Sequence, residues 1–193
     1  MNNAQRLKLL TNSKKSVFSL KDVQALWDIK NNTTKILIKR MVDQGLVLRI
    51  GKGYYAIDKD FNTYELANLI ISPSYVSFNS ALFYHGVAFQ KSNTIKSVSL
   101  LNYKRNLGGL NFEYYAMKKS LFFNLDGIDY KNNLSMAFPE RAVLDCFYFG
   151  LLPNLDNVNK INFTYLKKIS IFYPKSVIKK VNKLIKNYDE NRD

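Results

Sequence analysis

Residues 31–57, NNTTKILIKRMVDQGLVLRIGKGYYAI, decide the fold of the amino-terminal part of the chain. Apolar side chains recur there at the three- and four-residue spacing of one buried helical face, at Leu37, Ile38, Met41 and Val42. Asn32 or Thr33 is expected to cap the start of this helix through a side-chain oxygen. Gly45 is placed to end it in the left-handed conformation. The charged residues of the helix are then left to face outward.

A hairpin is predicted directly after this helix. Residues 46–50 and 54–57 read as strands, and they flank Gly51-Lys52-Gly53. Both glycines can adopt the positive φ angles that a tight turn requires. A helix followed by a basic hairpin is the second half of a winged helix-turn-helix. In that motif the helix enters the major groove of DNA, and the hairpin, or wing, lies against the flanking backbone.

The upstream sequence supplies the first half of the same motif. Residues 3–11 predict a short helix, and Val17-Phe18 predict a short strand that joins the wing. Ser19 followed by Asp22 marks the start of a second helix, since an acidic group favours the helix amino terminus. We therefore predict a winged helix-turn-helix domain over residues 1–58.

Seven residues of the helix and wing are the candidate DNA contacts: Thr33, Thr34, Lys35, Lys39, Arg40, Arg49 and Lys52. Lysine and arginine can donate to guanine or neutralise phosphates, and threonine hydroxyls at a helix start can bond a phosphate. Ile36 could touch only a thymine methyl group. The wing residues would meet the backbone or the minor groove. The alternative for this face is a charged surface that meets only solvent, and the surrounding motif favours DNA.

The charge of the chain also favours a polyanionic partner. The net charge is +14, with 29 basic and 15 acidic residues. Residues 1–60 hold 12 basic and 5 acidic residues, residues 61–159 hold 8 and 7, and residues 160–193 hold 9 and 3. The excess therefore lies at the two ends of the chain, around a nearly neutral middle.

A second domain is expected over residues 62–193, after a polar boundary at residues 58–62. Helices are predicted from Thr63, after Ser77, over 139–149 and over 164–187 with a break at Pro174, and strands over 97–101, 111–116 and 134–138. The strands at 97–101 and 111–116 are expected to lie around a Gly108-Gly109 turn. The predicted fold class is α+β, with an amino-terminal winged helix-turn-helix and a mixed carboxy-terminal domain.

The sequence shows no catalytic, cofactor or metal site that we can recognise. His85 is expected to satisfy carbonyls at a helix end, and Cys146 to be a buried, inert thiol. Glu113, Glu140 and Asp145 are the acids from which a metal-dependent nuclease site would be built. They lack a lysine at suitable spacing, and helix capping and surface exposure explain Glu140 and Asp145.

The chain contains a single cysteine, and no run of it approaches the length of a membrane span. No leader is expected, since residues 1–10 lack the long apolar run of a signal peptide. An internal disulfide is excluded, and no membrane partner is expected. A cytoplasmic location is the expectation that follows.

Motifs in the second domain resemble those of a known family. They are Ser72-Pro73-Ser74-Tyr75-Val76-Ser77, then Ser80-Ala81-Leu82 with Tyr84-His85-Gly86, and later Pro139-Glu140-Arg141-Ala142-Val143-Leu144-Asp145. Together with the winged helix that ends in Gly51-Lys52-Gly53-Tyr54-Tyr55, they resemble the AbiEi antitoxins of bacterial abortive-infection toxin–antitoxin systems. The resemblance covers roughly residues 5–185. Arg141 stands where the family usually has lysine, and the motifs also have a purely structural interpretation.

The resemblance implies an antitoxin that represses its own operon. Its partners would be double-stranded DNA, at repeats in its own promoter, and a nucleotidyltransferase-like toxin. Two alternatives remain open. One is a protein-interaction module that neutralises a partner by direct contact, with incidental DNA binding. The other is a DNA-processing enzyme. The basic carboxy-terminal run is either a solvated helix face or a second electropositive patch, for DNA flanks or for an acidic or RNA-bound protein partner: Lys160, Lys167, Lys168, Lys175, Lys179, Lys180, Lys183 and Lys186.

Overall fold

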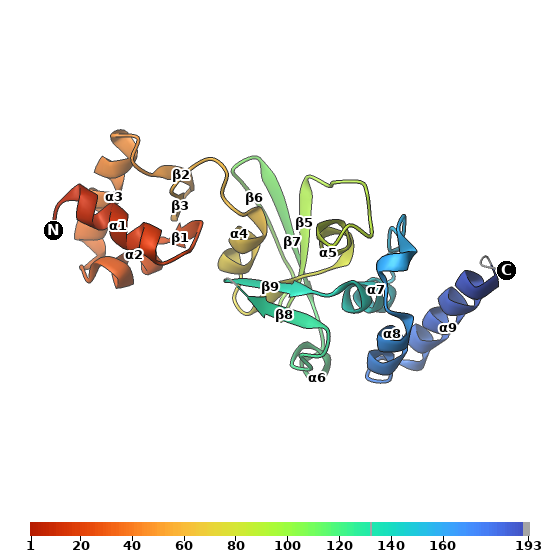
Figure 1. The fold of residues 1–193 in the computed structure, drawn as a ribbon. Helices are drawn as coiled ribbons and strands as arrows, with labels where there is room; N and C mark the ends of the chain where they lie inside the picture. Colours follow the sequence, from red (N-terminus) through yellow and green to blue (C-terminus); the bar gives the residue numbers. More distant parts are fainter. Residues whose placement is uncertain (132, 191–193) are drawn as a thin grey trace.

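Two β-sheets and the helices around them make up residues 1–131 and 133–190, which the computed structural model describes (Figure 1). The chain is an α+β protein, as predicted. The elements in chain order are α1 (Asn3–Asn12), β1 (Val17–Ser19), α2 (Leu20–Trp27), α3 (Asn31–Asp43), β2 (Leu48–Gly51), β3 (Tyr54–Ala56), α4 (Thr63–Ile70), β4 (Ser74–Val76), α5 (Phe78–Tyr84), β5 (Thr94–Ser99), β6 (Tyr103–Leu107), β7 (Leu110–Ala116), α6 (Lys119–Phe122), β8 (Ile128–Lys131), β9 (Leu134–Ala137), α7 (Pro139–Tyr148), a 3-10 turn (Val158–Lys160), α8 (Phe163–Ser170) and α9 (Lys175–Glu190).

The amino-terminal unit contains α1, α2 and α3 beside a three-stranded antiparallel sheet of order β1-β3-β2. The predicted strand at Val17-Phe18 is confirmed, since Val17 pairs with Ala56 and Phe18 with Tyr55. Apolar side chains from all three helices and the sheet form its buried cluster: Leu10, Phe18, Val23, Trp27, Ile38, Met41, Val47 and Tyr55. Burying this cluster removes apolar surface from water and fixes the three helices against the sheet.

The ends of α2 and α3 follow from local chemistry. Ser19 caps α2 by accepting a bond from the Asp22 amide, and Asp22 accepts one from the Ser19 amide in return, so the predicted start signal is confirmed. Asp28 ends α2 in the left-handed conformation, with φ at 53°. Only residues 29 and 30 then remain before α3 begins at Asn31. The expectation that Asn32 or Thr33 caps α3 is wrong, because Lys30 occupies the cap and offers no side-chain bond.

A six-stranded mixed sheet forms the centre of the second unit, in the order β6-β7-β5-β4-β9-β8. Strands β5 and β7 run parallel, as do β4 and β9, whereas the other neighbours are antiparallel. The outermost strands are β6 and β8. Figure 1 shows the amino-terminal unit at one end of the molecule, the large sheet in the middle and α8 with α9 at the opposite end.

The strand predictions for this sheet need one correction. The turn at Gly108-Gly109 joins β7 to β6, whereas the predicted strand at 97–101 corresponds to β5, which spans Thr94–Ser99 and pairs with β7 in parallel. The polar stretch of β6 lacks a clear apolar alternation because β6 is an exposed edge strand. Its strand conformation therefore depends on its pairing with β7 and could not be predicted from its own residues.

Packing continues across the predicted domain boundary at residues 58–62. Val17 and Ala56 of the small sheet belong to the same buried cluster as Leu66 of α4 and the core of the large sheet. Ser16 donates from its amide and its hydroxyl to the buried Glu65 carboxylate, at 3.0 and 2.6 Å. The boundary segment therefore connects two units that are packed and hydrogen-bonded to each other.

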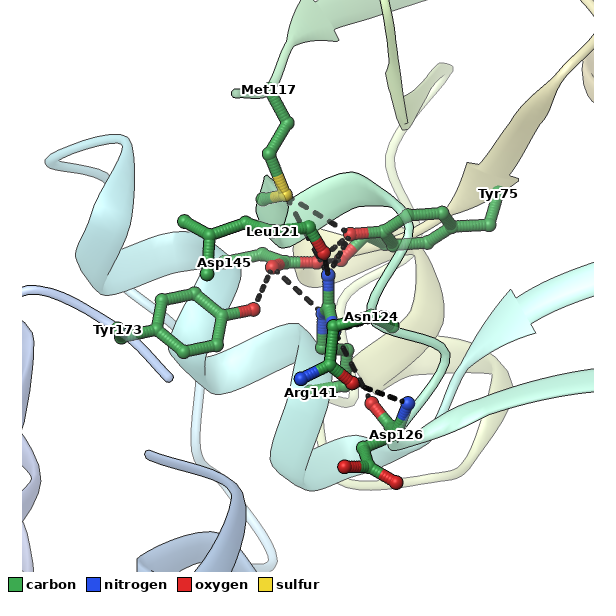
Figure 2. Close-up of polar contacts among 9 residues, drawn as sticks. Tyr75, Met117, Leu121, Asn124, Asp126, Arg141, Asp145 and Tyr173 are labelled. Carbon is green, nitrogen blue, oxygen red and sulfur yellow. Dashed lines mark hydrogen bonds and ion pairs between the residues drawn. The ribbon is translucent and has the colours of Figure 1, made fainter. Parts of the chain in front are cut away.

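A buried ion pair links the elements of the second unit (Figure 2). Arg141 Nε donates to Asp145 Oδ1 at 3.2 Å, and both side chains are almost fully removed from solvent. Asp145 also accepts hydrogen bonds from three hydroxyl groups, those of Tyr75, Ser77 and Tyr173. The expectation that Asp145 is a surface residue is wrong, because these donors satisfy its charge inside the protein.

The guanidinium of Arg141 is equally well satisfied. It donates to the carbonyl oxygens of Leu121, Asn124 and Asp126 and to the Tyr75 hydroxyl. Burial lowers the pKa of Arg141, but the Asp145 carboxylate and the Tyr75 and Tyr173 hydroxyls together raise it by more, so the net direction is upward. The guanidinium therefore stays charged. Its hydrogen bonds and those of Asp145 tie β4, α6, the loop before β8, α7 and the connection between α8 and α9 together.

We expect Asp145→Asn to destabilise the protein by about 3–5 kcal/mol, because it leaves the Arg141 charge buried without its partner. Urea unfolding followed by circular dichroism measures this difference. The matched control is Glu113→Gln, which breaks an exposed pair with Lys104 and should cost at most about 1 kcal/mol. An Asp145→Asn variant as stable as the control would show that the ion pair does not hold the core.

Candidate nucleic-acid interface

Helix α3 presents a cationic outer face. Its inner face holds the buried Thr34, Ile38 and Met41, and this spacing turns Lys35, Ile36, Lys39 and Arg40 toward solvent, as predicted. Three of these four exposed side chains are positively charged. Gly45, two residues after the end of α3, adopts the left-handed conformation, with φ at 70°. The Leu46 amide donates to the Met41 carbonyl. The helix end is therefore fixed directly before the hairpin.

The amino terminus of α3 adds a second feature that suits an anion. No side chain caps it, and its first turn contains no acidic residue. Asn31, Asn32 and Thr33 are all exposed there. The first amide groups of a helix lack intrahelical partners and carry partial positive charge, which favours a phosphate at this end.

The hairpin β2–β3 places two further cations at the surface, Arg49 and Lys52. Of its two glycines only Gly53 has a positive φ, at 84°, so the expectation that both provide this conformation holds for one of them. The Gly53 carbonyl accepts a bond from the Leu20 amide at 3.0 Å. This bond ties the tip of the hairpin to the first residue of α2.

The cations of this surface form no ion pair with the residues that the structure describes. Over residues 1–131 and 133–190, no ion pair involves Lys35, Lys39, Arg40, Arg49 or Lys52. Exposed cations that are unpaired and gathered on one helix and the adjacent hairpin can neutralise several phosphates of one duplex.

Thr34 does not belong to this surface, which corrects one predicted contact. Its side chain is fully buried, and its hydroxyl donates to the carbonyls of Ile29 and Lys30 at 3.3 and 3.0 Å. The hydroxyl thus joins the first turn of α3 to the connection from α2. The other six predicted contact residues are exposed and remain available to a ligand.

No family model and no curated protein matches the chain.

The acids considered for a nuclease site have separate partners. Glu113 pairs with Lys104 at 2.8 Å, Glu140 accepts a bond from the Asn162 amide at 2.7 Å, and Asp145 belongs to the buried ion pair. Glu140 lies in the first turn of α7, as predicted, and is buried there. Within the described part of the chain, no three side chains of histidine, cysteine, aspartate or glutamate are placed to hold a metal ion.

His85 and Cys146 have structural surroundings. His85 follows α5 and bonds through Nε2 to the Ala137 carbonyl of β9 at 3.0 Å, whereas the sequence predicted a bond to carbonyls at its own helix end. Burial lowers the pKa of the imidazole, which keeps it neutral at pH 7. Cys146 is fully buried, as predicted, and burial raises the pKa of its thiol.

Sequence reasoning missed Asn31 and Asn32 as part of this surface, because it expected α3 to begin later. Asp28 was the available signal, since aspartate tolerates the left-handed conformation better than most residues and so ends a helix early.

None of the helices in the described ranges combines the length and apolar character needed to cross a bilayer.

We expect Thr34→Val to lower the free energy of unfolding by about 0.5–1.5 kcal/mol, because it keeps the side-chain shape and removes a buried hydroxyl bond. Lys35→Ala, one position along, changes only an exposed side chain and should stay within about 0.5 kcal/mol of the unmodified chain. Urea unfolding of both variants makes the comparison. Equal stabilities would mean that the Thr34 hydroxyl does not secure α3.

Proposed function

We propose that the chain is a DNA-binding transcriptional regulator whose amino-terminal unit is a winged helix-turn-helix. The order α1-β1-α2-α3-β2-β3 supports this, because the motif needs a recognition helix followed by a hairpin wing. In this proposal α3 lies in the major groove, and β2–β3 is the wing. The single observation that carries the proposal is the cationic face of α3 and the wing, which is set on a packed three-helix unit and has no ion-pair partner among residues 1–131 and 133–190.

The roles of the residues follow from their chemistry. Lys35, Lys39 and Arg40 donate to base edges or phosphates in the major groove, and Thr33 lies in the uncapped first turn of α3, beside a phosphate. Arg49 and Lys52 contact the backbone from the wing. Each neutralised phosphate adds about 0.9 to the slope of log K against log salt concentration.

We further propose that the regulated gene is the chain's own operon and that the chain is an antitoxin. The support is the resemblance to the AbiEi family. Its separate motifs meet in one place, since Tyr75 and Ser77 of the first motif bond Asp145 of the last. The ion partner Arg141 belongs to that last motif as well. Such a network has a structural role and supports a shared fold. The expected partner is a nucleotidyltransferase-like toxin.

A specific observation favours a second function, direct contact with an acidic protein partner. Lysines 167, 168, 175, 179 and 183 of α8 and α9 are exposed, and none of them is in an ion pair within the described residues. Figure 1 shows α9 at the opposite end of the molecule from α3. This surface is therefore separate from the proposed DNA-binding surface.

We expect the double substitution Lys35→Glu/Lys39→Glu to abolish binding to the operon's own promoter while the fold survives. Reversing two charges replaces attraction to phosphates by repulsion. Fluorescence anisotropy with labelled promoter duplex at moderate salt measures the loss, and circular dichroism checks the fold. The matched control is Lys91→Glu/Lys118→Glu, two exposed lysines of the second unit. Unchanged promoter binding by the α3 variant would remove α3 from the interface.

The two functions separate in a second experiment with Lys179→Glu/Lys183→Glu. If α9 binds an acidic partner, this variant should repress the promoter fully but lose its ability to restore growth when the product of the neighbouring reading frame is expressed. The expected loss is at least about tenfold in affinity for that partner, as for close charge pairs at interfaces. Full protection of growth by the variant would exclude this face of α9 from the contact.

A further inference from the structure

The wing makes close contact with the β6–β7 hairpin of the second unit. A Cβ atom built on Gly51 of β2 would lie 2.2 Å from Leu107 Cδ1 of β6, and one built on Gly108 would lie 2.8 Å from Ile50 Cγ2. The glycines at these two positions thus allow the hairpins to approach each other. Leu107 is buried in this contact, 56 residues away from Gly51 in the sequence.

A second contact joins the same two hairpins through Arg105 and Tyr54. The guanidinium carbon of Arg105 lies 4.8 Å from the centre of the Tyr54 ring, and Nη1 donates to the Tyr54 hydroxyl at 3.5 Å. A planar guanidinium stacks on an aromatic ring in a way that a lysine ammonium does not reproduce. Arg105 therefore holds β3 through the planar shape of its guanidinium.

An isolated two-stranded hairpin has little stability of its own in water. If the wing were held only by its pairing with β1, ordering it on DNA would reduce the affinity that Arg49 and Lys52 supply. The β6–β7 hairpin removes this cost by fixing β2 and β3 before DNA binds. The bond from the Leu20 amide to the Gly53 carbonyl fixes the tip of the wing relative to α2.

We propose that Arg105 and Leu107 are positioning residues that hold the wing at a fixed position relative to α3, so that the wing and α3 reach the same duplex. The proposal rests on the proposed DNA-binding function. It assigns to the second unit a direct part in DNA affinity that acts through the wing and needs no DNA contact by Arg105 or Leu107.

The first test exchanges volume between Gly51 and Leu107. Gly51→Val adds three carbon atoms where Leu107 lies, and Leu107→Ala removes three. Gly51→Val alone should displace the wing and weaken promoter binding by about three- to tenfold, the scale of one or two lost phosphate contacts. The double variant should recover to within about twofold of the unmodified chain, because coupled neighbours are not additive.

Lys52→Ala reports whether the wing has moved. In the unmodified chain it should weaken binding by about threefold or more, as the loss of a phosphate contact. In the Gly51→Val background it should have no further effect, because the displaced wing no longer reaches the backbone. A purely structural role of Leu107 would change stability without removing the effect of Lys52→Ala.

The second test separates the shape of Arg105 from its charge. Arg105→Lys keeps the charge and loses the stacked plane, so it should weaken binding as much as Arg105→Ala does. Tyr54→Phe keeps the ring and should bind like the unmodified chain. Binding by Arg105→Lys equal to that of the unmodified chain, with loss only in Arg105→Ala, would mean that Arg105 acts as a charge toward DNA and would overturn the positioning role.

The outcomes distinguish this proposal from the one on which it rests. If Lys35→Glu/Lys39→Glu leaves promoter binding unchanged, the assignment of α3 fails, and the positioning role fails with it. A different set of results would overturn only the positioning role. In it, Lys35→Glu/Lys39→Glu loses promoter binding, Gly51→Val and Arg105→Lys bind normally, and Lys52→Ala still weakens binding in each of these two backgrounds. Circular dichroism and urea unfolding establish whether each variant is folded. If Gly51→Val does not fold, promoter binding by Arg105→Lys tests the positioning role on its own.

Discussion

A carboxylate without access to water determines the arrangement of the second unit. Asp145 must be met by donors from within the protein, because an ionised group left unpaired in the interior costs several kcal/mol. Those donors come from β4, α7 and Tyr173 in the connection between α8 and α9, and the partner Arg141 in turn binds carbonyls around α6. Satisfying one charge therefore fixes several elements relative to one another (Figure 2). One of them is β4 of the large sheet, whose edge strand β6 meets the β2–β3 hairpin.

The small amino-terminal unit depends on this larger body in a second way. Its own buried cluster is modest, and part of its sheet packs into the core of the second unit through Val17 and Ala56. The Ser16–Glu65 bonds and the contact of Leu107 with Gly51 hold it at two places. Because small domains bury a low fraction of their surface, this support contributes to holding a helix and a hairpin in one fixed orientation. A surface that is rigid before binding loses less affinity to ordering.

Local patterns predicted the amino-terminal elements well because their determinants lie within a few residues. The apolar spacing around Ile38 gave the outward face of α3, and Ser19 with Asp22 gave the start of α2. Burial that depends on distant residues could not be predicted in this way. The environment of Thr34 depends on where α2 ends, that of Gly51 on Leu107, and that of Asp145 on tyrosines 70 residues before it and 28 residues after it. Thr34 and Asp145 were predicted to lie at the surface, but both are buried and hydrogen-bonded inside the protein.

Photo-crosslinking from position 36 is a direct test of whether α3 meets DNA, because Ile36 lies on the exposed face of α3 among the cations and its replacement leaves every charge in place. The chain would carry a photoreactive amino acid there and be irradiated with promoter duplex. If α3 lies in the major groove as proposed, crosslinks form to bases at one defined place in the duplex, and none form when the same group replaces Ile171, which is exposed before α9. Crosslinks from position 171 with none from position 36 would contradict this placement of α3.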